Sequence, residues 1–421
     1  MSHLKQTLQD FLTQAQAKGS FDLNGLMGSM EPAFQKGGYR TAHAGSTEHI
    51  LVLRLDEIGD NVLTSGFLRE LRRSNPAAHI TLVTSPAAYN IVELCPYVND
   101  VLPFSVTGRP MLQQFHIAMD FCEANLWQRY FSRCYLPRWD FDRYFGYFLC
   151  YLSGARQRIS YTTDVYAGKA QVNHSMNQLL THIVPEQDGI IHEAARNFQV
   201  LRATGMQVAD DRMELWLSEA DHAKADELLK DFLPNGEILA VVAIGANERA
   251  RLYPIPMLAD ALRPLAGDGL RFAIIGGPHD AASGDELARL VASKKKDGSA
   301  IIRNLCGKAS LRESAAVMSH AALYVGNETG NTHIAAALRI PIVEMNREAL
   351  SFPPNKLSYA LRFAPWQVPY CLLRPKKALD DCGKHITAAG CNAPEAHCIK
   401  QVTPKEITSA CREMLRVQWN K

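Results

Sequence analysis

The sequence predicts an α/β protein made of two halves, each with a parallel β-sheet covered by helices. Strand-like and helix-like segments alternate over residues 50–161 and again over residues 238–344. Between these blocks, an acidic helical segment at residues 219–232 leads into a Leu-Pro-Asn-Gly turn at residues 233–236, which predicts a hinge. Two Rossmann-like halves joined in this way place the carboxyl edges of both sheets on one cleft, where such folds bind their ligands.

Composition narrows the classes of function. The 421 residues suffice for two or three domains, and 45 Lys and Arg residues nearly balance 43 Asp and Glu residues. A nucleic-acid-binding protein would show a basic excess, so nucleic acid is not an expected partner. The N-terminus lacks a secretory pattern, and apolar runs such as residues 145–152 are too short to span a bilayer. We therefore expect a cytoplasmic protein, with peripheral contact to a membrane left open.

Residues 1–45 are expected to form an N-terminal extension. Apolar residues share one face of a predicted helix that Ser2 caps and Gly19 ends. Residues 20–47 are rich in small residues and show no clear period. The extension would dock on the body of the chain or on a second copy, which leaves a homo-oligomer through these residues open.

The first block, residues 46–218, is predicted to form an N-terminal Rossmann-like domain. Its apolar runs predict strands at residues 50–55, 79–84, 116–120, 158–161 and 213–217 and near residue 101. Helices are predicted at residues 61–73, 87–94 and 192–204. An aromatic and basic insert occupies residues 127–158.

After a hinge region at residues 219–236, residues 237–365 are predicted to form a C-terminal Rossmann-like domain. Its strands are predicted at residues 238–244, 271–275, 300–305, 322–325 and 341–344. Two capping boxes, Ser310 with Glu313 and Thr403 with Glu406, predict the starts of two helices. In residues 366–421, a loop-rich tail segment with four cysteines leads into a closing helix through residue 417.

Residues 322–341 read as strand, tight turn and helix, with Thr329 and Gly330 at the turn. Such a turn presents free N–H groups and the positive end of a helix dipole, which together bind anions such as phosphate. The alternative is that Thr329 merely caps the helix and His333 packs within it.

Two further loops of the second half follow predicted strands. Arg249 and Arg251 lie in a short loop after residues 238–244, where they could clamp a pyrophosphate; solvated surface charge is the alternative. Asp280 follows a Gly-Gly pair, where it could accept from ribose hydroxyls or cap the next helix.

In the first half, Asp60 follows the strand at residues 50–55 and a glycine. The stretch lacks the Gly-x-Gly-x-x-Gly pattern, which disfavours a nicotinamide or flavin dinucleotide here. Asp60 would act either as a helix N-cap or as a general base for a substrate hydroxyl.

Aromatic and basic residues of the insert suit an anionic glycolipid, because aromatic faces stack on sugars and arginines bind phosphate. The candidates for acceptor binding are Arg138, Trp139 and Arg143, and half-buried packing is the alternative. Asp140 and Asp142 have Asp-x-Asp spacing, but their basic neighbours disfavour a metal site.

The tail holds four crowded cysteines, Cys371, Cys382, Cys391 and Cys398. Their spacing contains no Cys-x-x-Cys knuckle, so a structural metal is a weaker interpretation than free thiols or a redox-sensitive pair.

Four stretches together resemble glycosyltransferase family 9, the ADP-heptose-dependent heptosyltransferases of bacterial lipopolysaccharide and related glycans. They are residues 53–60 (Leu-Arg-Leu-Asp-Glu-Ile-Gly-Asp), 137–140 (Pro-Arg-Trp-Asp), 192–197 (His-Glu-Ala-Ala-Arg-Asn) and 326–337 (Gly-Asn-Glu-Thr-Gly-Asn-Thr-His-Ile-Ala-Ala-Ala). The likeness runs in the family's order from about residue 50 to residue 417, so the N-terminal extension lies outside it.

The resemblance implies a GT-B fold in which the C-terminal half binds the nucleotide sugar and the N-terminal half binds the acceptor. By this resemblance Asp60 matches the catalytic base. The donor-site matches are Thr329, Gly330 and His333 at the phosphate turn, Glu328 where the family usually has Asp, and Arg251 where it has a phosphate-binding Lys.

The expected enzyme is an inverting, metal-independent glycosyltransferase that moves heptose from ADP-heptose to a lipopolysaccharide-core or related glycan or glycolipid. It would need no cofactor and would work in the cytoplasm, with contact to the inner membrane left open. The alternatives are a heptosyltransferase for autotransporter proteins, a sugar-nucleotide epimerase of the same architecture, and a noncatalytic assembly protein. The crowded tail cysteines resemble those of family members that heptosylate autotransporter proteins and carry iron at these cysteines.

Overall fold

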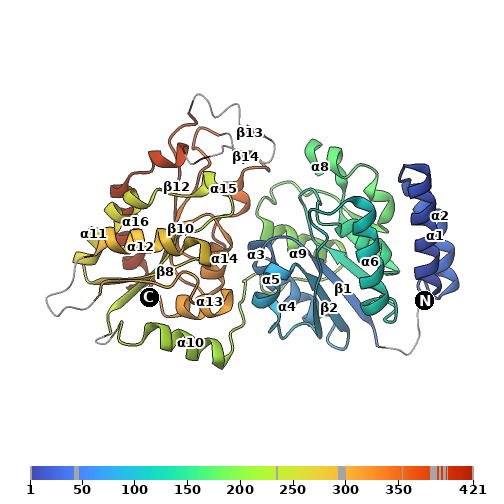
Figure 1. Ribbon diagram of the computed structural model, residues 1–421, viewed down its shortest axis with the longest axis horizontal. Helices are drawn as coiled ribbons and strands as arrows, with labels where there is room; N and C mark the ends of the chain where they lie inside the picture. The colour runs from blue at the N-terminus through green and yellow to red at the C-terminus, as the bar shows by residue number, and fades with distance from the viewer. Residues whose placement is uncertain are drawn as a thin grey trace.

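The computed structural model describes residues 2–41, 47–233, 236–292, 300–352, 354–379, 386–387, 390–391, 395 and 397–419. Within these residues the chain forms two parallel six-stranded sheets, each with helices on both faces (Figure 1). The predicted α/β architecture of two halves is confirmed.

The first sheet has the strand order β3-β2-β1-β4-β5-β6. Its strands are β1 (His49–Arg54), β2 (His79–Thr84), β3 (Asp100–Pro103), β4 (Arg133–Leu136), β5 (Gln157–Tyr161) and β6 (His182–Val184). Its helices are α3 (Ile58–Val62), α4 (Ser65–Ser74), α5 (Pro86–Val92), α6 (Met111–Asn125), α7 (Gly146–Leu152), α8 (Ala167–Val172) and α9 (Glu193–Ala203). Five of the six residues of β1 are buried, as expected of a central parallel strand.

The second sheet has the order β12-β11-β10-β7-β8-β9, which is the same winding as the first. Its strands are β7 (Ile238–Ala243), β8 (Leu270–Ile275), β9 (Ile302–Asn304), β10 (Leu323–Asn327), β11 (Ile342–Met345) and β12 (Tyr370–Leu373). Its helices are α10 (Glu219–Leu229), α11 (Ile255–Gly267), α12 (Ala281–Val291), α13 (Leu311–Ser319), α14 (Gly330–Ala337), α15 (Tyr359–Arg362) and α16 (Pro404–Trp419). A small hairpin pairs β13 (Ile386–Thr387) with β14 (Gly390–Cys391).

The strand order of each sheet reverses between two strands, β1 and β4 in the first sheet and β7 and β10 in the second. Ligands of open α/β sheets bind beyond the carboxyl ends of the strands at such a reversal. The loops that follow these four strands are therefore where a functional site is expected.

The N-terminal extension forms two helices, α1 (His3–Lys18) and α2 (Leu23–Lys36), that pack beside α6 at the right of Figure 1. Ser2 caps α1 and Gly19 ends it in the left-handed conformation, as predicted. Helix α2 was not predicted, because Gly25, Gly28 and Pro32 interrupt its pattern.

The strand predicted at residues 116–120 is wrong, since these residues lie inside α6, whose buried residues recur at helical spacing. The single helix predicted at residues 61–73 is divided into α3 and α4. The aromatic insert is not a separate feature, because it contains β4, which pairs with β1 in the sheet. The strand predicted at residues 213–217 is also wrong, since these residues form neither a strand nor a helix.

Both predicted capping boxes are present. Ser310 and Glu313 cap α13 reciprocally, and the Glu406 carboxylate accepts a 2.7 Å bond from the N–H of Thr403. Helix α16 then packs against α11 and the strands β10, β11 and β12, so the end of the chain closes the second half.

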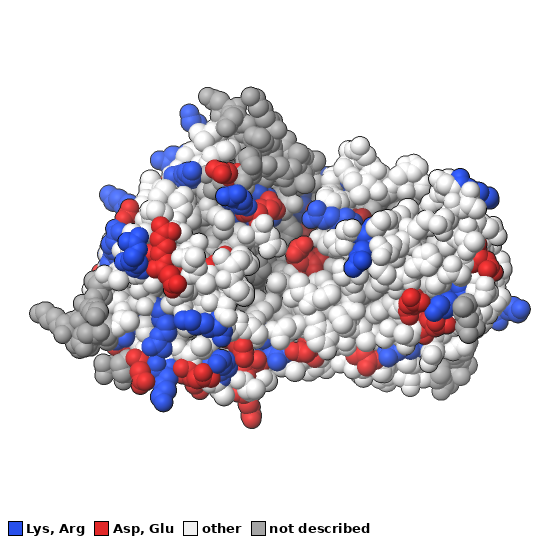
Figure 2. Space-filling model, viewed as in Figure 1, with Lys and Arg blue, Asp and Glu red and all other residues white. Residues whose placement is uncertain are grey.

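Acidic and basic side chains are intermixed on the visible face, with uncharged stretches between them, and this face is hollowed between the two lobes (Figure 2). Among the described residues, none of the helices combines the length and the apolar character needed to cross a bilayer. The predicted hinge turn includes Pro234 and Asn235, which lie outside the described residues.

Candidate active site

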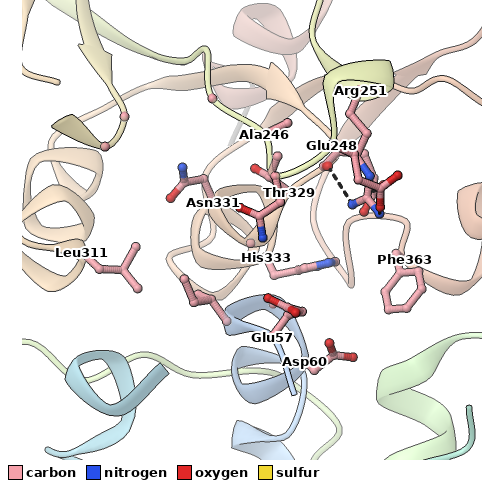
Figure 3. A pocket seen from close by; sticks show the side chains of 18 of the residues that line it. Glu57, Asp60, Ala246, Glu248, Arg251, Leu311, Thr329, Asn331, His333 and Phe363 are labelled. Atoms are coloured by element: carbon pink, nitrogen blue, oxygen red, sulfur yellow. Dashed lines mark hydrogen bonds and ion pairs between the residues drawn. The ribbon is translucent and has the colours of Figure 1, made fainter. Parts of the chain in front are cut away.

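A cavity of about 780 Å³ lies between the two sheets, at the ends of β1, β4, β7 and β10. The following predicted site residues line it: Asp60, Arg138, Arg143, Arg251, Asp280, Glu328, Thr329, Gly330 and His333. Figure 3 shows Glu57 and Asp60 on one wall, from the first half, and Thr329, Asn331 and His333 on the opposite wall. The structure thus brings both halves of the predicted site to one cavity.

Asp60 lies in the first turn of α3, directly after the end of β1. Its Oδ1 accepts a 3.0 Å hydrogen bond from Nη2 of Arg54, and its side chain is 15% exposed. Arg54 also holds Asp56 at 3.0 Å, and Asp56 pairs with Arg138. Two arginines and two carboxylates therefore alternate along this wall.

Burial and the Asp56 carboxylate raise the pKa of Asp60 to about 7, against the opposing effect of Arg54 and Arg138. A carboxyl group that titrates near neutral pH can be ionised at physiological pH and still accept a proton. The geometry supports the interpretation of Asp60 as a base, because its side chain does not cap α3, whose N-cap is Glu57.

On the opposite wall, Thr329 is the N-cap residue of α14, but its side chain makes no capping hydrogen bond. The hydroxyl oxygen of Thr329 is buried and has no hydrogen-bond partner in the described part of the chain. Since the first N–H groups of a helix have no intrahelical partner, this turn can bind an anion through the amides and the hydroxyl together.

Gly59 and Gly330 bring the two walls into direct contact. A Cβ atom on Gly330 would lie 3.2 Å from the Gly59 nitrogen, and one on Gly59 would lie 2.7 Å from Cδ2 of His333. His333 is buried, and burial lowers its pKa to about 3, so its ring is neutral. The close approach therefore requires glycine at position 59, whereas a Cβ atom at position 330 would be in tight contact with the first half.

We expect Gly59→Ala to lower the free energy of unfolding by about 1–3 kcal/mol, because the added methyl must displace the packed His333 ring. Gly267→Ala in α11 is the matched control, since nothing lies within 4 Å of a Cβ atom there. Urea unfolding of the two variants checks this. Equal stability of both would show that the walls do not touch as described.

Arg251 lies after β7, in the 3-10 turn η3 (Arg249–Arg251). Its guanidinium is 3.0 Å from Oε2 of Glu328 and 2.7 Å from Oε1 of Glu248, and Glu248 in turn pairs with Arg347. Burial raises the pKa of Glu328, while Arg251 and Arg347 lower it. Arg251 thus reaches the cavity between two carboxylates, whereas Arg249 is exposed and does not line it.

Asp280 follows β8, in the 3-10 turn η4 (Pro278–Asp280). Its Oδ2 accepts a 2.8 Å hydrogen bond from the Gly277 amide, and its carboxylate rests against Gly245 and Gly276, where a Cβ atom would come within 2.5 and 2.7 Å. The residue therefore caps the turn and faces the cavity at the same time.

The predicted acceptor residues differ in their surroundings. Arg138 lines the cavity but is held by Asp56 and by the Phe141 carbonyl at 2.8 Å. Arg143 is exposed at the cavity, 5.5 Å from the centre of the Tyr144 ring. The prediction for Trp139 is wrong, because its ring is 1% exposed and lies between Tyr166 and Arg196, with no face free for a sugar.

Sequence reasoning missed Arg54, Glu193, Tyr359 and Arg362, which all line the cavity. Arg54 had a local signal, since it is a charge at the end of an apolar strand. Glu193 and Arg362 are paired across 169 positions of sequence, and nothing local indicates that contact.

Both carboxylates of the Asp-x-Asp pair are engaged within the protein. Asp140 is held by Arg362 and Tyr166, and Asp142 accepts from the amides of Tyr144 and Tyr147.

Of the four tail cysteines, Cys371 lies in β12 and is half-buried, and Cys398 is buried. Cys382 lies outside the described residues, as does the side chain of Cys391. Within the described ranges, no three His, Cys, Asp or Glu side chains form a group that could hold a metal ion.

A family model described as glycosyltransferase family 9 (heptosyltransferase) matches residues 152–347. The chain is 23% identical over 291 residues to lipopolysaccharide heptosyltransferase 3 of Escherichia coli K12, covering 68% of this chain and 79% of that protein.

Two solved structures have a similar fold. A glycosyl transferase family 9 protein of Veillonella parvula superposes with a TM-score of 0.66 at 19% identity, covering 90% of this chain and all (100%) of that one. The Escherichia coli ADP-heptose lipopolysaccharide heptosyltransferase II superposes with a TM-score of 0.61 at 18% identity, covering 89% and 100%. The predicted GT-B fold is thereby confirmed.

Proposed function

Because this chain is a heptosyltransferase-like glycosyltransferase of family 9, we propose that it moves heptose from ADP-heptose to a lipopolysaccharide-core or related glycan acceptor. The names of its relatives support the donor and the acceptor class. The observation that carries the proposal is that Asp60 and the Thr329–Gly330 turn face each other across one cavity.

On the donor side, the diphosphate would lie on the N-terminus of α14, against Arg251. Asp280, beside Gly276, would accept from the ribose hydroxyls, and Glu328 would accept from hydroxyls of the heptose. The side chain of Glu328 is one methylene longer than that of the Asp that the family usually has here. Its carboxylate would therefore reach further toward the sugar. Its ion pair with Arg251 would couple the holding of the sugar to the holding of the diphosphate.

In the transfer step, the acceptor hydroxyl attacks the anomeric carbon from the face opposite to ADP and gives its proton to Asp60. The bond between the anomeric carbon and the diphosphate oxygen breaks, and the negative charge on ADP is stabilised by the α14 amides and Arg251. A single displacement of this kind inverts the anomeric configuration. In this proposal, Arg251 and the positive end of the α14 dipole supply the positive charge that stabilises the departing ADP.

On the acceptor side, Arg138 and Arg143 would hold the anionic groups of the core oligosaccharide. The site of action would be the cytoplasm, with contact to the inner membrane where a lipid-linked acceptor is embedded. Helices α1 and α2 already cover their own chain beside α6, so an oligomer through residues 1–45 would use their outer faces.

We expect kcat/KM to rise with pH and to reach half its maximum near pH 7. The pKa of Asp60 is raised to about 7, so the carboxyl is protonated and inactive as a base below this value and ionised above it. Initial rates between pH 5.5 and 8.5, with donor and acceptor both well below their KM values, would check this. A rate that stays flat or falls as pH rises through 7 would contradict the assignment.

A transfer assay tests the proposed function. The protein is incubated with ADP-heptose, ADP-glucose or UDP-glucose, together with deacylated core oligosaccharide or an autotransporter protein. The proposal predicts release of ADP from ADP-heptose that depends on the core acceptor. Transfer only to the autotransporter protein would make the chain a protein heptosyltransferase. Isomerised sugar in the absence of any acceptor would indicate an epimerase. Failure to bind ADP in calorimetry would indicate a noncatalytic protein.

A further inference from the structure

Arg362 crosses from the second half of the protein into the first. It belongs to α15, in the connection between β11 and β12, and is 1% exposed. Its Nε donates to Oε1 of Glu193 at 2.8 Å, and its Nη2 donates to Oδ2 of Asp140 at 2.8 Å. Both carboxylates belong to the first half, so a cation of one half neutralises two acids of the other, the buried Glu193 and the half-buried Asp140.

The position of this guanidinium is fixed by what surrounds it. It lies 4.9 Å from the centre of the Trp139 ring, and Arg196 stacks on the same ring at 3.4 Å. Arg196 also pairs with Glu193 at 2.7 Å. Trp139, which does not reach the cavity, is therefore a platform for the two arginines that share Glu193.

One chain of contacts leads from Arg362 to Asp60 through the loop after β4. Asp140 accepts a 2.8 Å bond from the Phe141 amide, and the Phe141 carbonyl accepts a 2.8 Å bond from Nε of Arg138. Arg138 then pairs with Asp56, beside Asp60. Holding Asp140 in place thus holds the arginine that flanks the proposed base. Lys169 supports the same loop from beneath, donating to the Trp139 carbonyl at 2.9 Å.

A second chain runs through α9. Glu193 begins this helix and lines the cavity, and Asn197 follows one turn later. Asn197 accepts a hydrogen bond from Nη1 of Arg54 at 3.4 Å and donates to the Leu63 carbonyl at 2.9 Å. Because Arg54 carries the hydrogen bond to Asp60, the placement of α9 also bears on the carboxylate of Asp60.

The charges that face Asp60 come from several elements. They are Arg54 of β1, Asp56 of the following loop, Arg138 of the loop after β4 and Glu193 of α9. From the second half, the ring of His333 approaches Gly59, next to Asp60, and is neutral. Glu193 raises the pKa of Asp60. Burial would raise the pKa of Glu193 itself, but Arg362 and Arg196 lower it, so Glu193 is an anion whose charge these arginines offset.

We propose that Arg362 is a positioning residue for Asp60, supplied across the cleft by the second half of the chain. It fixes Arg138 and α9 around Asp60 and offsets the charge of Glu193. Since its partners lie in the other half, the surroundings of the base are complete when the two halves are in contact. The inference rests on the proposed function, because it assigns Arg362 to the same transfer step.

Arg362→Gln tests this. We expect the pH midpoint of kcat/KM to move up by about 0.5–1 unit and kcat to fall about tenfold, while the affinity for ADP changes less than about twofold. Arg362→Lys keeps the charge without the two-pronged geometry, so its midpoint should stay close to that of the parent protein while kcat remains reduced.

Lys356→Met is the matched control. Lys356 forms another contact between the halves, 2.6 Å from Glu186, and does not line the cavity. If Arg362 only held the two halves together, Arg362→Gln and Lys356→Met would change the pH midpoint of kcat/KM by similar amounts. We expect Lys356→Met to leave the pH midpoint unchanged.

Removing one partner of a buried ion pair can prevent folding, so the double variant Arg362→Gln, Glu193→Gln is included. Both charges are then absent, and the midpoint should return toward that of the parent protein, whereas Glu193→Gln alone should lower it. The proposal would be overturned if the pH midpoint of Arg362→Gln equalled that of the parent protein. If Arg362→Gln does not fold, an unchanged midpoint in Glu193→Gln would overturn it instead. A shift in Lys356→Met as large as that in Arg362→Gln would also overturn it. If the parent protein itself transfers no sugar, the proposed function fails instead.

Discussion

Asp60→Asn should lower kcat by about 10²–10⁴-fold and leave the binding of ADP nearly unchanged. Asparagine has the same size and can still accept the hydrogen bond from Arg54, but it cannot take a proton from the acceptor hydroxyl. The diphosphate site lies on the opposite wall of the cavity, so the substitution leaves it intact. Initial rates with ADP-heptose and acceptor, together with calorimetry of ADP, measure the two effects separately.

Glu57→Gln is the control for Asp60→Asn. Glu57 is an exposed carboxylate that lines the same wall three positions earlier, where it accepts a 3.2 Å hydrogen bond from Tyr144. Its loss should reduce kcat by less than about fivefold. Similar rates for Asp60→Asn and the parent protein, or equal losses in both variants, would remove Asp60 from the role of base.

Arg251→Met should weaken ADP binding by about 10- to 100-fold, which corresponds to the loss of one charge-assisted hydrogen bond of about 1.5–3 kcal/mol. It should also lower kcat, because charge grows on the diphosphate as the bond to the sugar breaks. Arg251→Lys should recover part of both losses, since the charge persists without the planar guanidinium.

Arg249→Met is the control for Arg251, because the two arginines share one turn but Arg249 does not line the cavity. The predicted pair of phosphate-clamping arginines is thus reduced to one. Calorimetric titration with ADP compares the variants. If Arg249→Met weakened ADP binding as much as Arg251→Met, or neither did, the diphosphate would lie elsewhere.

The sequence was sufficient for the features that depend on local patterns. The buried strands β1, β7 and β10 appear as apolar runs, and the turns after them carry the residues that meet in the cavity. These predictions succeeded because the ends of strands at a reversal of order must lie together in a doubly wound sheet. The sequence could therefore predict that Asp60 and Thr329 line the same cleft, although it gives no distance between them.

What failed depended on tertiary context. Residues 116–120 form too short an apolar run to distinguish strand from helix by period, and the surrounding contacts of α6 decide for helix. An aromatic residue beside arginines is typical of a surface on which a sugar stacks. Trp139 is instead buried beneath two other arginines, Arg196 of α9 and Arg362 of α15. The pairing of Arg362 with Glu193 and Asp140 requires the two halves to meet, which no local pattern encodes.

A structure of the protein bound to ADP would show whether the diphosphate site faces Asp60. We expect diphosphate oxygens within about 2.7–3.1 Å of the first amides of α14 and of the Arg251 guanidinium, with the terminal phosphate directed across the cavity toward Asp60. If ADP were bound outside the cavity between the two sheets, or inside it with its phosphates directed away from Asp60, Asp60 could not be the base for transfer from this donor.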